Sequence, residues 1–407
     1  MKGAHQRDRS SSDCPGKPRP HVGPGDTAAR RGPAVQAEGP QIEPLELRGH
    51  EHVADLIDHC YGRSGFNGRR LAEACRLYSR MVGEDTTIAV TLSGAMTPIG
   101  MSGVLNSLIR AGFVDFIIAT GANLYHDLHR AIDAPMYQGS FAVDDNELAE
   151  AGIARIYDVF IGERETLMET DNWILKLLRD FDFDKPFSTA TLHHALGRAV
   201  REHAPHPEKS LVATAAEYDV PIYTSSPGDS SIGMNLIMPQ LFGRTVQLNP
   251  MLDVIETAAL VRAATRNGVV EVGGGSPKNF YLQTQPTLHQ ILMDPSKGGH
   301  DYFIQLTTDA PHWGGLSGAT PQEARSWGKI KDATINNVVV YSCASLTFPL
   351  LAQYVLTRNK PRKPMRLFQS LEACVEALRA AAQANKELRQ NLEKCGIALK
   401  SSGRDRS

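Results

Sequence analysis

From about residue 43 onward, the chain alternates continuous apolar runs with helix-like segments, and most of the runs end in Gly or Ser. A short apolar run followed by such a turn and a helix pattern is typical of a βα unit in a parallel sheet. We therefore predict a doubly wound α/β fold, with helices flanking a mostly parallel sheet. The expected strands are 87–92, 113–120, 221–225, 268–272, 302–306 and 337–341, and helix patterns follow the first two at 100–111 and 126–131.

The two ends of the chain differ from this pattern. Residues 1–42 are rich in Pro, Gly, Arg and Ser and have almost no apolar periodicity. Such a segment buries too little surface to offset chain entropy, so we predict a disordered tail. Residues 366–399 carry Leu and Val at mostly helical spacings between charged residues. This pattern predicts a long amphipathic helix or a helix pair, packed on the core or on a partner subunit. The expected division is 1–42, 43–365 and 366–407.

Composition narrows the classes of protein and of site. The chain has 407 residues, of which 42% are hydrophobic and 22% are charged. Its net charge of -2 argues against nucleic-acid or anionic-membrane partners. The six cysteines form no CxxC pair, so we expect neither a metal site nor a disulfide framework. We find no signal-peptide pattern and no apolar run as long as about 18 residues. A cytoplasmic protein is the expectation.

Gly-rich strand ends are the first candidates for ligand binding. In open α/β sheets, ligands bind beyond the carboxyl ends of the strands, and a following helix N-terminus favours phosphate. The segment Val272-Gly-Gly-Gly-Ser-Pro-Lys278 is the best candidate for a pyrophosphate cradle. Asp229, in a second such turn, could accept a hydrogen bond from a ribose hydroxyl or serve as a helix N-cap.

Lys329 is the candidate for chemistry, because it follows a Trp-Gly pair and precedes Ile330. An ammonium among aromatic and small residues loses hydration, which lowers its pKa towards neutrality. A partly neutral lysine can attack carbonyl or imine carbons and form a Schiff base. The alternative is an ordinary lysine in an exposed loop.

These segments together resemble a known family. Ser326-Trp-Gly-Lys-Ile330, the strand and turn 338–345, the stretch Phe348-Pro-Leu-Leu351 and the Gly triplet 273–275 are similar to deoxyhypusine synthase, from about residue 45 to 365. The resemblance implies a Rossmann-like, NAD-dependent homotetramer with active sites at subunit interfaces. It also implies that NAD takes a hydride from spermidine and that an aminobutyl group passes through a lysine imine to an acceptor amine.

The resemblance assigns roles to residues of this chain. Lys329 would be the covalent carrier, Trp327 would pack on the aliphatic amine chain, and Glu323 would face an ammonium group. The NAD site would be lined by backbone and hydroxyl groups together with one carboxylate: Gly273, Gly274, Asp229, Thr307, Thr308 and Ser317.

Five positions depart from the family pattern. Asn279 stands where the family has His, and we expect it in the substrate pocket. Leu316 and Met234 stand where the family has Asp, His126 replaces a Glu, and Cys343 replaces a ribose-binding Asp. The amine pocket should therefore be less negative than in the family.

This altered pocket leads to the predicted function. We expect an aminobutyl transferase that acts on a di- or polyamine and uses a small amine acceptor, giving a homospermidine- or spermidine-type product. Two alternatives remain open. One is deoxyhypusine synthase activity on a translation-factor lysine, and the other is an NAD-binding protein without transferase activity.

Overall fold

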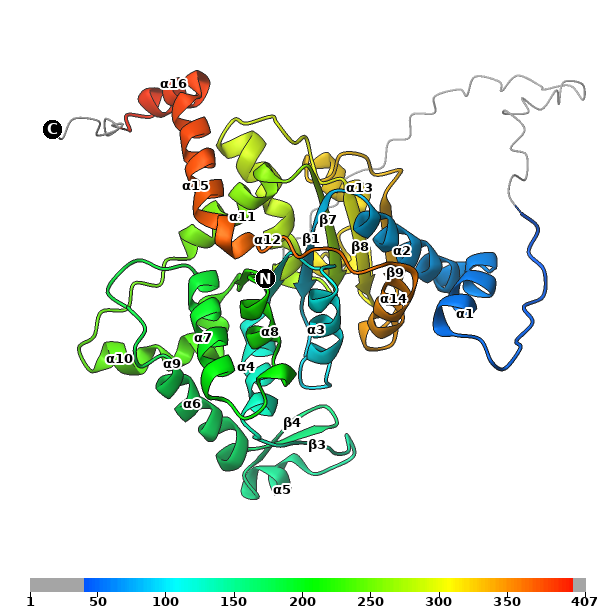
Figure 1. Cartoon of the computed structure of the whole chain (residues 1–407), viewed down its shortest axis with the longest axis horizontal. Helices are drawn as coiled ribbons and strands as arrows, with labels where there is room; N and C mark the ends of the chain where they lie inside the picture. Colours follow the sequence, from blue (N-terminus) through cyan, green and yellow to red (C-terminus); the bar gives the residue numbers. More distant parts are fainter. Residues whose placement is uncertain (1–39, 398–407) are drawn as a thin grey trace, which may run out of the picture. The chain divides into compact units, whose positions relative to one another are not determined.

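A six-stranded parallel sheet forms the centre of the computed structural model, which describes residues 40–397 (Figure 1). Nearly all of the predicted tail, residues 1–39, lies outside the described residues. The strand order is β6-β2-β1-β7-β8-β9. The strands are β1 (Thr86–Leu92), β2 (Phe116–Ala119), β6 (Ile222–Tyr223), β7 (Arg266–Val272), β8 (Tyr302–Thr307) and β9 (Asn337–Tyr341).

The order reverses between β1 and β7. From β1 the chain moves outward to β2 and β6, and it then returns to β7 and moves the other way to β8 and β9. All neighbouring strands in this sheet are parallel. This is the strand order of a Rossmann-type sheet, so the predicted doubly wound α/β fold is confirmed.

Some predicted bounds were wrong, for local reasons. The second strand begins only at Phe116, because Phe113 closes the preceding helix with a hydrogen bond from its N–H to the Leu108 carbonyl. The helix predicted at 126–131 already begins at Gly121, with Thr120 as its N-cap residue. The third strand keeps only Ile222 and Tyr223 at the edge of the sheet.

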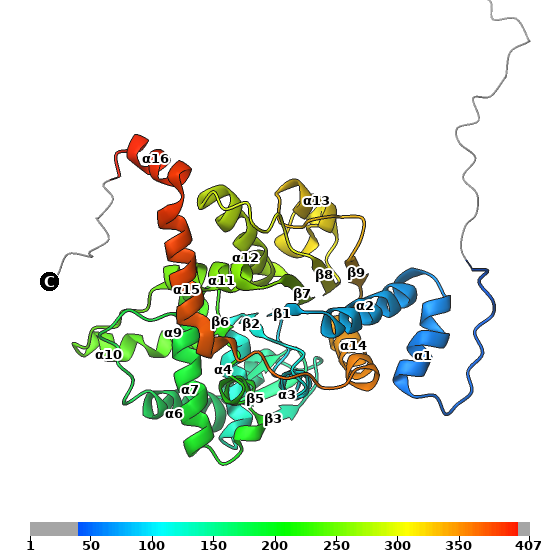
Figure 2. The same cartoon turned by 45° about the horizontal axis from the view of Figure 1, so that its top comes forward.

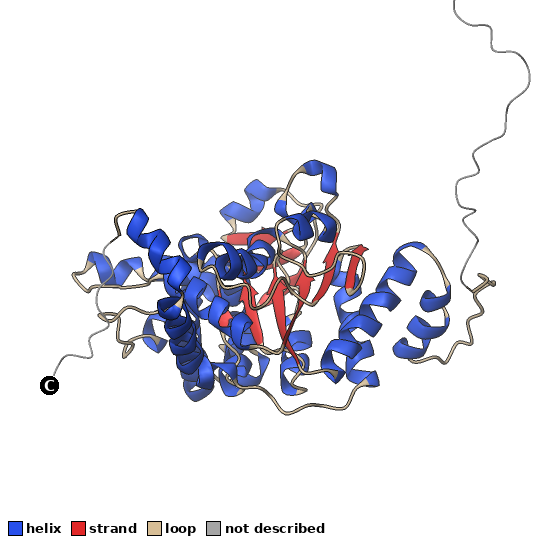
Figure 3. Ribbon diagram, turned by 90° about the horizontal axis from the view of Figure 1, so that it is seen from above, coloured by secondary structure: helices blue, strands red, loops and turns tan. Residues whose placement is uncertain are grey.

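Helices cover both faces of the sheet, as Figure 3 shows from above. One apolar core joins α2, α3 and α14 to β1, β8 and β9, and a second joins α11 and α12 to the opposite face. No helix within residues 40–397 is long and apolar enough to cross a membrane. The helices up to α14 are α1 (Val53–His59), α2 (Phe66–Gly83), α3 (Ser102–Arg110), α4 (Gly121–Ala131), α5 (Asp145–Glu150), α6 (Glu169–Leu177), α7 (Thr189–His203), α8 (Leu211–Glu217), α9 (Ser231–Asn235), α10 (Ile237–Leu241), α11 (Pro250–Ala263), α12 (Gly275–Pro286), α13 (Pro321–Ser326) and α14 (Ala344–Arg358).

A small antiparallel sheet, which the sequence pattern does not predict, follows α4. Its order is β3-β5-β4, with β3 at Met136–Gln138, β4 at Ile153–Ile156 and β5 at Val159–Gly162. These strands are three or four residues long and mostly half-buried or exposed. They therefore lack the continuous apolar runs that mark the central strands.

The predicted amphipathic segment at the C-terminus forms two helices, α15 (Leu367–Ala384) and α16 (Lys386–Lys394). The buried side chains of Leu371 and Leu378 belong to the core that α11 shares with the sheet. Figure 2 shows α15 beside α11, with which it is in contact. The domain boundary proposed at residue 366 stays a prediction.

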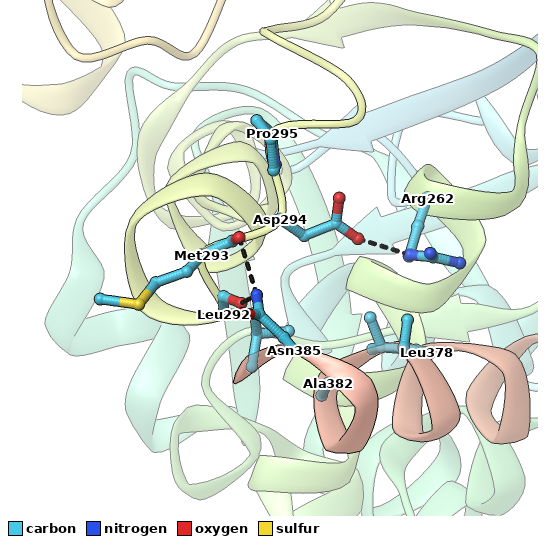
Figure 4. Close-up of a pocket in the computed structure, with 9 residues that line it drawn as sticks. Arg262, Leu292, Met293, Asp294, Pro295, Leu378, Ala382 and Asn385 are labelled. Carbon is cyan, nitrogen blue, oxygen red and sulfur yellow. Dashed lines mark hydrogen bonds and ion pairs between the residues drawn. The ribbon is translucent and has the colours of Figure 1, made fainter. Parts of the chain in front are cut away.

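Asn385, between these helices, holds their junction against the body of the protein (Figure 4). Its Oδ1 accepts the N–H of Leu388 at 3.1 Å and so caps α16. Its Nδ2 donates to the carbonyls of Leu292 and Met293 at 3.2 and 2.9 Å. The pocket beside it has a volume of about 200 Å³ and also contains the Arg262–Asp294 ion pair, but none of the predicted site residues.

We expect Asn385→Ala to lower the free energy of unfolding by roughly 1–3 kcal/mol, because it removes a helix cap and leaves two carbonyls without their donor. Urea titrations followed by circular dichroism measure this difference. Asn391→Ala is the matched control, since Asn391 is an exposed residue within α16. Equal loss of stability in both variants would contradict the role given to Asn385.

Candidate active site

The loops that leave β1, β7 and β8 meet where the strand order reverses. The Ser93 hydroxyl, just after β1, accepts the N–H of Gly274 at 2.7 Å and lies 3.1 Å from the Val272 carbonyl. The Ser317 hydroxyl accepts the N–H of Gly275 at 2.8 Å. These contacts fix the Gly-rich turn at the crevice where Rossmann-type sheets bind dinucleotides.

The turn depends on glycine at two positions. Gly273 has φ +80°, a left-handed conformation that L side chains rarely adopt. A Cβ on Gly274 would lie 2.5 Å from the Cα of Ser317, so the two backbones pass too closely for any side chain. The N-terminus of α12 begins directly after this turn, and its N–H groups and dipole favour a phosphate.

The loops that follow β2 and β6 reach the same edge of the sheet. Ser225 and Ser276 join the β6 loop to the start of α12, with their hydroxyl oxygens 2.8 Å apart. A Cβ on Gly121 would lie 2.2 Å from the side chain of Ser230, so these two loops are also in contact. The loops after β2 and β6 therefore converge with the Gly-rich turn at one edge of the sheet.

The remaining predicted cofactor residues lie in these loops. Thr307 is the buried last residue of β8, and Thr308 is the exposed residue after it. Asp229 is exposed at the end of a short 3-10 turn, while the neighbouring Ser230 caps α9. The alternative role of Asp229 as that cap is thus excluded.

The backbone of the Trp-Gly-Lys motif forms the C-terminal cap of α13. The N–H of Gly328 donates to the Arg325 carbonyl at 2.9 Å, and the N–H of Lys329 donates to the Ala324 carbonyl at 3.0 Å. This is the Schellman arrangement, and it requires the left-handed conformation that Gly328 adopts with φ +68°. The Lys329 carbonyl then accepts the N–H of His300 at 2.9 Å, so the backbone on both sides of the lysine is held.

The Lys329 side chain is half-buried and directed by a single polar partner. Its Nζ donates to Asn279 Oδ1 at 2.9 Å and lies 5.6 Å from the centre of the Trp327 ring. Partial burial lowers the pKa of Lys329, the negative charge of Glu323 raises it, and the positive charge of Lys278 lowers it further. Lys329 is thus not a fully exposed loop lysine, because its amine is half-buried and held by Asn279.

The outer side of this region is unusually apolar for exposed surface. Trp327 is 62% exposed, Trp313 is 71% exposed and Leu316 is 49% exposed. Glu323 lies on α13, where its N–H is capped by the Thr320 hydroxyl and its side chain is exposed. Trp327 and Glu323 are therefore both accessible near the amine of Lys329.

Two buried charged residues form a pair near the Gly-rich turn: Glu271, to which the sequence assigned no role, and Lys278, the last residue of the predicted pyrophosphate cradle. Glu271 on β7 is 0% exposed, and Lys278 on α12 is 2% exposed, with 3.8 Å between Glu271 Oε2 and Lys278 Nζ. The sequence did carry a signal for Glu271, because it is the one charged residue in the otherwise apolar run 268–272. Its partner, seven positions later, could be recognised only from the fold.

The positions that depart from the family pattern bring no new negative charge. His126 lies on α4 with its Nδ1 3.0 Å from His129 Nε2, and burial lowers the pKa of His126 to about 4. It is neutral at pH 7. Cys343, at the N-cap of α14, is exposed, and the Ser345 hydroxyl lowers the pKa of its thiol. Met234 on α9 is also exposed.

A half-buried glutamate on α11, Glu256, gives a prediction for how stability depends on pH. Burial raises the pKa of Glu256 to about 7, so folded protein keeps this proton between about pH 4 and pH 7 while unfolded protein loses it. Stability from this group is therefore present at low pH and lost as pH rises through that window. We expect Glu256→Gln to be more stable than the parent at pH 8 by roughly 1–3 kcal/mol and to show a flatter pH dependence.

Urea titrations at pH 5 and pH 8 test this expectation. Glu372→Gln is the control, since Glu372 is an exposed carboxylate on α15. An unchanged pH dependence in Glu256→Gln would show that the Glu256 proton is not linked to folding.

Comparisons with known proteins agree with this geometry. The deoxyhypusine synthase family model matches residues 55–355. A deoxyhypusine synthase-like protein of Nostoc punctiforme is 45% identical over 350 residues, covering 84% of this chain and 89% of the relative. A protein of the same description from Thermosynechococcus vestitus is 43% identical over 350 residues, covering 83% and 86%.

A solved structure shows the same fold. The crystal structure of a candidate deoxyhypusine synthase from Entamoeba histolytica has a TM-score of 0.50 and 16% sequence identity, covering 77% of this chain and 96% of that chain. With a family match over most of the sequence and relatives at 43–45% identity, the protein belongs to the deoxyhypusine synthase family.

Proposed function

We propose that this protein is an NAD-dependent transferase that carries an aminobutyl group on Lys329, from a di- or polyamine donor to a small amine acceptor. Family membership makes it an enzyme of the aminobutyl transferase class. The observation that carries the finer proposal is the half-buried amine of Lys329, held by Asn279 at 2.9 Å.

The glycine turn supports NAD as the cofactor. The backbone at Gly273 and Gly274 would face the pyrophosphate, because no side chain fits there. Ser317 accepts a hydrogen bond from Gly275, which leaves its own O–H free to donate to the ligand. Thr307, Thr308 and Asp229 would complete the site. When bound, NAD supplies the acceptor, and later the donor, of one hydride.

Lys329 would perform the transfer itself. Its neutral amine adds to the carbon of the donor's protonated imine, and the departing amine leaves neutral, so the positive charge passes to the imine now formed on Lys329. The reverse exchange with the acceptor amine frees the lysine. Asn279 Oδ1 orients the amine for attack, and the lowered pKa of Lys329 makes the neutral form available.

The surroundings of Lys329 favour an amine with few charges. Trp327 can cover an aliphatic chain, and Glu323 can bind one ammonium group. Neutral His126, Leu316 and Met234 stand where the family resemblance expects carboxylates, which weakens the site for a longer polycation. We infer a small diamine acceptor rather than a protein lysine.

We also propose a homotetramer in which a second copy covers the site. The exposed Trp313, Leu316 and Trp327 support a covered surface, as does the apolar segment of α9 and α10 with Met234, Ile237, Leu241 and Phe242. Light scattering coupled to gel filtration measures the assembly. A monomer that is fully active would contradict this part of the proposal.

Product analysis tests the choice of acceptor. Isotope-labelled spermidine and NAD are incubated with the protein and with either putrescine or a purified precursor of the hypusine-containing translation factor. We expect label in a new polyamine with putrescine and none in the protein acceptor. Label in the translation factor alone would overturn the small-amine proposal, and label in neither would overturn transfer.

A further inference from the structure

Glu271 sits in a row of side chains that crosses one face of the central sheet. Its register neighbours are Thr91 on β1 and Gln305 on β8. In parallel strands these neighbours point to the same face, which here is the face covered by α12. A carboxylate in the middle of a buried strand is costly unless a cation balances it.

Lys278 supplies that cation but gives its hydrogen bonds to other groups. Its Nζ donates to Gln305 Oε1 at 2.9 Å and to the Ala319 carbonyl at 2.7 Å, and it lies 3.4 Å from the Ser317 carbonyl. With these three oxygens around it, the ammonium is solvated without Glu271, which stays 3.8 Å away. The interaction of Lys278 with Glu271 is thus one of charge.

The Glu271 oxygens are not used by any described donor. Within residues 40–397, neither Oε1 nor Oε2 has a hydrogen-bond partner, and the same holds for the buried hydroxyls of Thr91 and Tyr281. A carboxylate that served only to hold the fold would be expected to accept hydrogen bonds from it. The carboxyl of Glu271 therefore has no hydrogen-bonding role in the described fold that would explain its place beside the site.

The charged groups around this pair connect it to Lys329. Lys278 directly precedes Asn279 on α12, and Asn279 Oδ1 accepts the Lys329 ammonium at 2.9 Å. The charges of Lys278 and Lys329 both act on Glu271. Lys329 is faced by Glu323, Lys278 and Glu271, and the His289 ring lies against Gly328. Burial raises the pKa of Glu271, and the charges of Lys278 and Lys329 oppose that rise. Asp309 and Glu323 act on Lys278 in turn.

We propose that Glu271 is a buried counter-ion. It stabilises the cation that forms when Lys329 carries its substrate as a protonated imine, and it acts through Lys329. The inference rests on the proposed function, because it concerns the intermediate on Lys329. In the transfer, the positive charge of the donor's protonated imine passes to the imine on Lys329, and no proton is gained or lost by the reacting groups together. Glu271 balances that positive charge. In the free enzyme, Lys278 keeps Glu271 from attracting the Lys329 ammonium too strongly.

The pKa of the Lys329 amine measures this influence without cofactor, substrate or turnover. Trace labelling with acetic anhydride across a pH series, read by mass spectrometry of the Lys329 peptide, gives the midpoint for the full chain. Exposed Lys363 is the internal reference. A unit charge within about 10 Å shifts such a midpoint by on the order of one pH unit at an effective dielectric constant of about 20.

Three variants separate the effect of charge from a structural role. We expect Glu271→Gln to lower the Lys329 midpoint, Lys278→Met to raise it, and the double variant to return it close to the parent value. Lys278→Met and the double variant differ only at position 271, which is Glu in the first and Gln in the second. In the double variant both charges of the pair are removed, so no buried cation is left unbalanced. Their comparison therefore measures Glu271 even if Glu271→Gln fails to fold.

Equal midpoints in Lys278→Met and the double variant would overturn the counter-ion role. The Lys329 midpoints do not depend on transfer, so this result can be told apart from failure of the proposed function. In that case the midpoints shift as expected, but no aminobutyl group reaches Lys329.

Discussion

Lys329→Arg is expected to lower the rate of aminobutyl transfer by at least about 10³-fold, the scale expected when an enzyme loses its covalent nucleophile. Arginine keeps the positive charge and most of the length of the side chain. Its guanidinium stays protonated at any pH that a protein tolerates, so it cannot supply a neutral amine. The hydrogen bond to Asn279 and the contact with Trp327 can persist.

The rate is measured from the release of labelled product with donor, acceptor and NAD all saturating. Lys363→Arg is the control and should match the parent, since Lys363 is an exposed lysine away from α13. NAD binding should change less than about threefold in Lys329→Arg. Activity within tenfold of the parent would mean that another amine carries the group.

Gly274→Ala is expected to weaken NAD binding roughly 10- to 100-fold. This is the loss of affinity that corresponds to the free-energy cost of forcing one extra methyl group into a close-packed contact. The new Cβ would lie 2.5 Å from Ser317 Cα, and a main-chain atom cannot rotate away. The loop after β8 must therefore move, which breaks the hydrogen bond of 2.8 Å between Ser317 and the N–H of Gly275.

Isothermal titration with NAD measures the change. Gly103→Ala is the matched control, because Gly103 lies in α3 with no atom near the position of its Cβ. We expect that control to bind NAD as the parent does. An unchanged affinity in Gly274→Ala, in a protein that still folds, would place the dinucleotide elsewhere.

Much of the fold was accessible from the sequence because buried parallel strands read as continuous apolar runs. The strand at Asn337–Tyr341 was predicted to the residue, and β7 and β8 within two residues. The short strands β3, β4 and β5 carry no comparable pattern, so all three were missed. The strand predicted at 221–225 was too long, because β6 keeps only Ile222 and Tyr223.

The candidate site was predicted in part, for a different reason. Lys329 and Gly274 stand in local patterns, a Trp-Gly-Lys cap and a glycine triplet, in which the neighbouring Gly328 and Gly273 adopt left-handed conformations that favour glycine. Ser93 meets Gly274 across 181 positions, and Glu271 meets Lys278 only because a turn folds α12 back over β7. Such pairings arise from the tertiary fold and have no local signature.

The most direct test of the account is reductive trapping of the covalent intermediate. The protein is incubated with NAD and spermidine, reduced with borohydride, digested and mapped by mass spectrometry. We predict an aminobutyl increment on the peptide that contains Lys329, dependent on NAD and absent from Lys329→Arg. An increment on another lysine, or none on a protein that binds both NAD and spermidine, would contradict the central claim that Lys329 carries the transferred group.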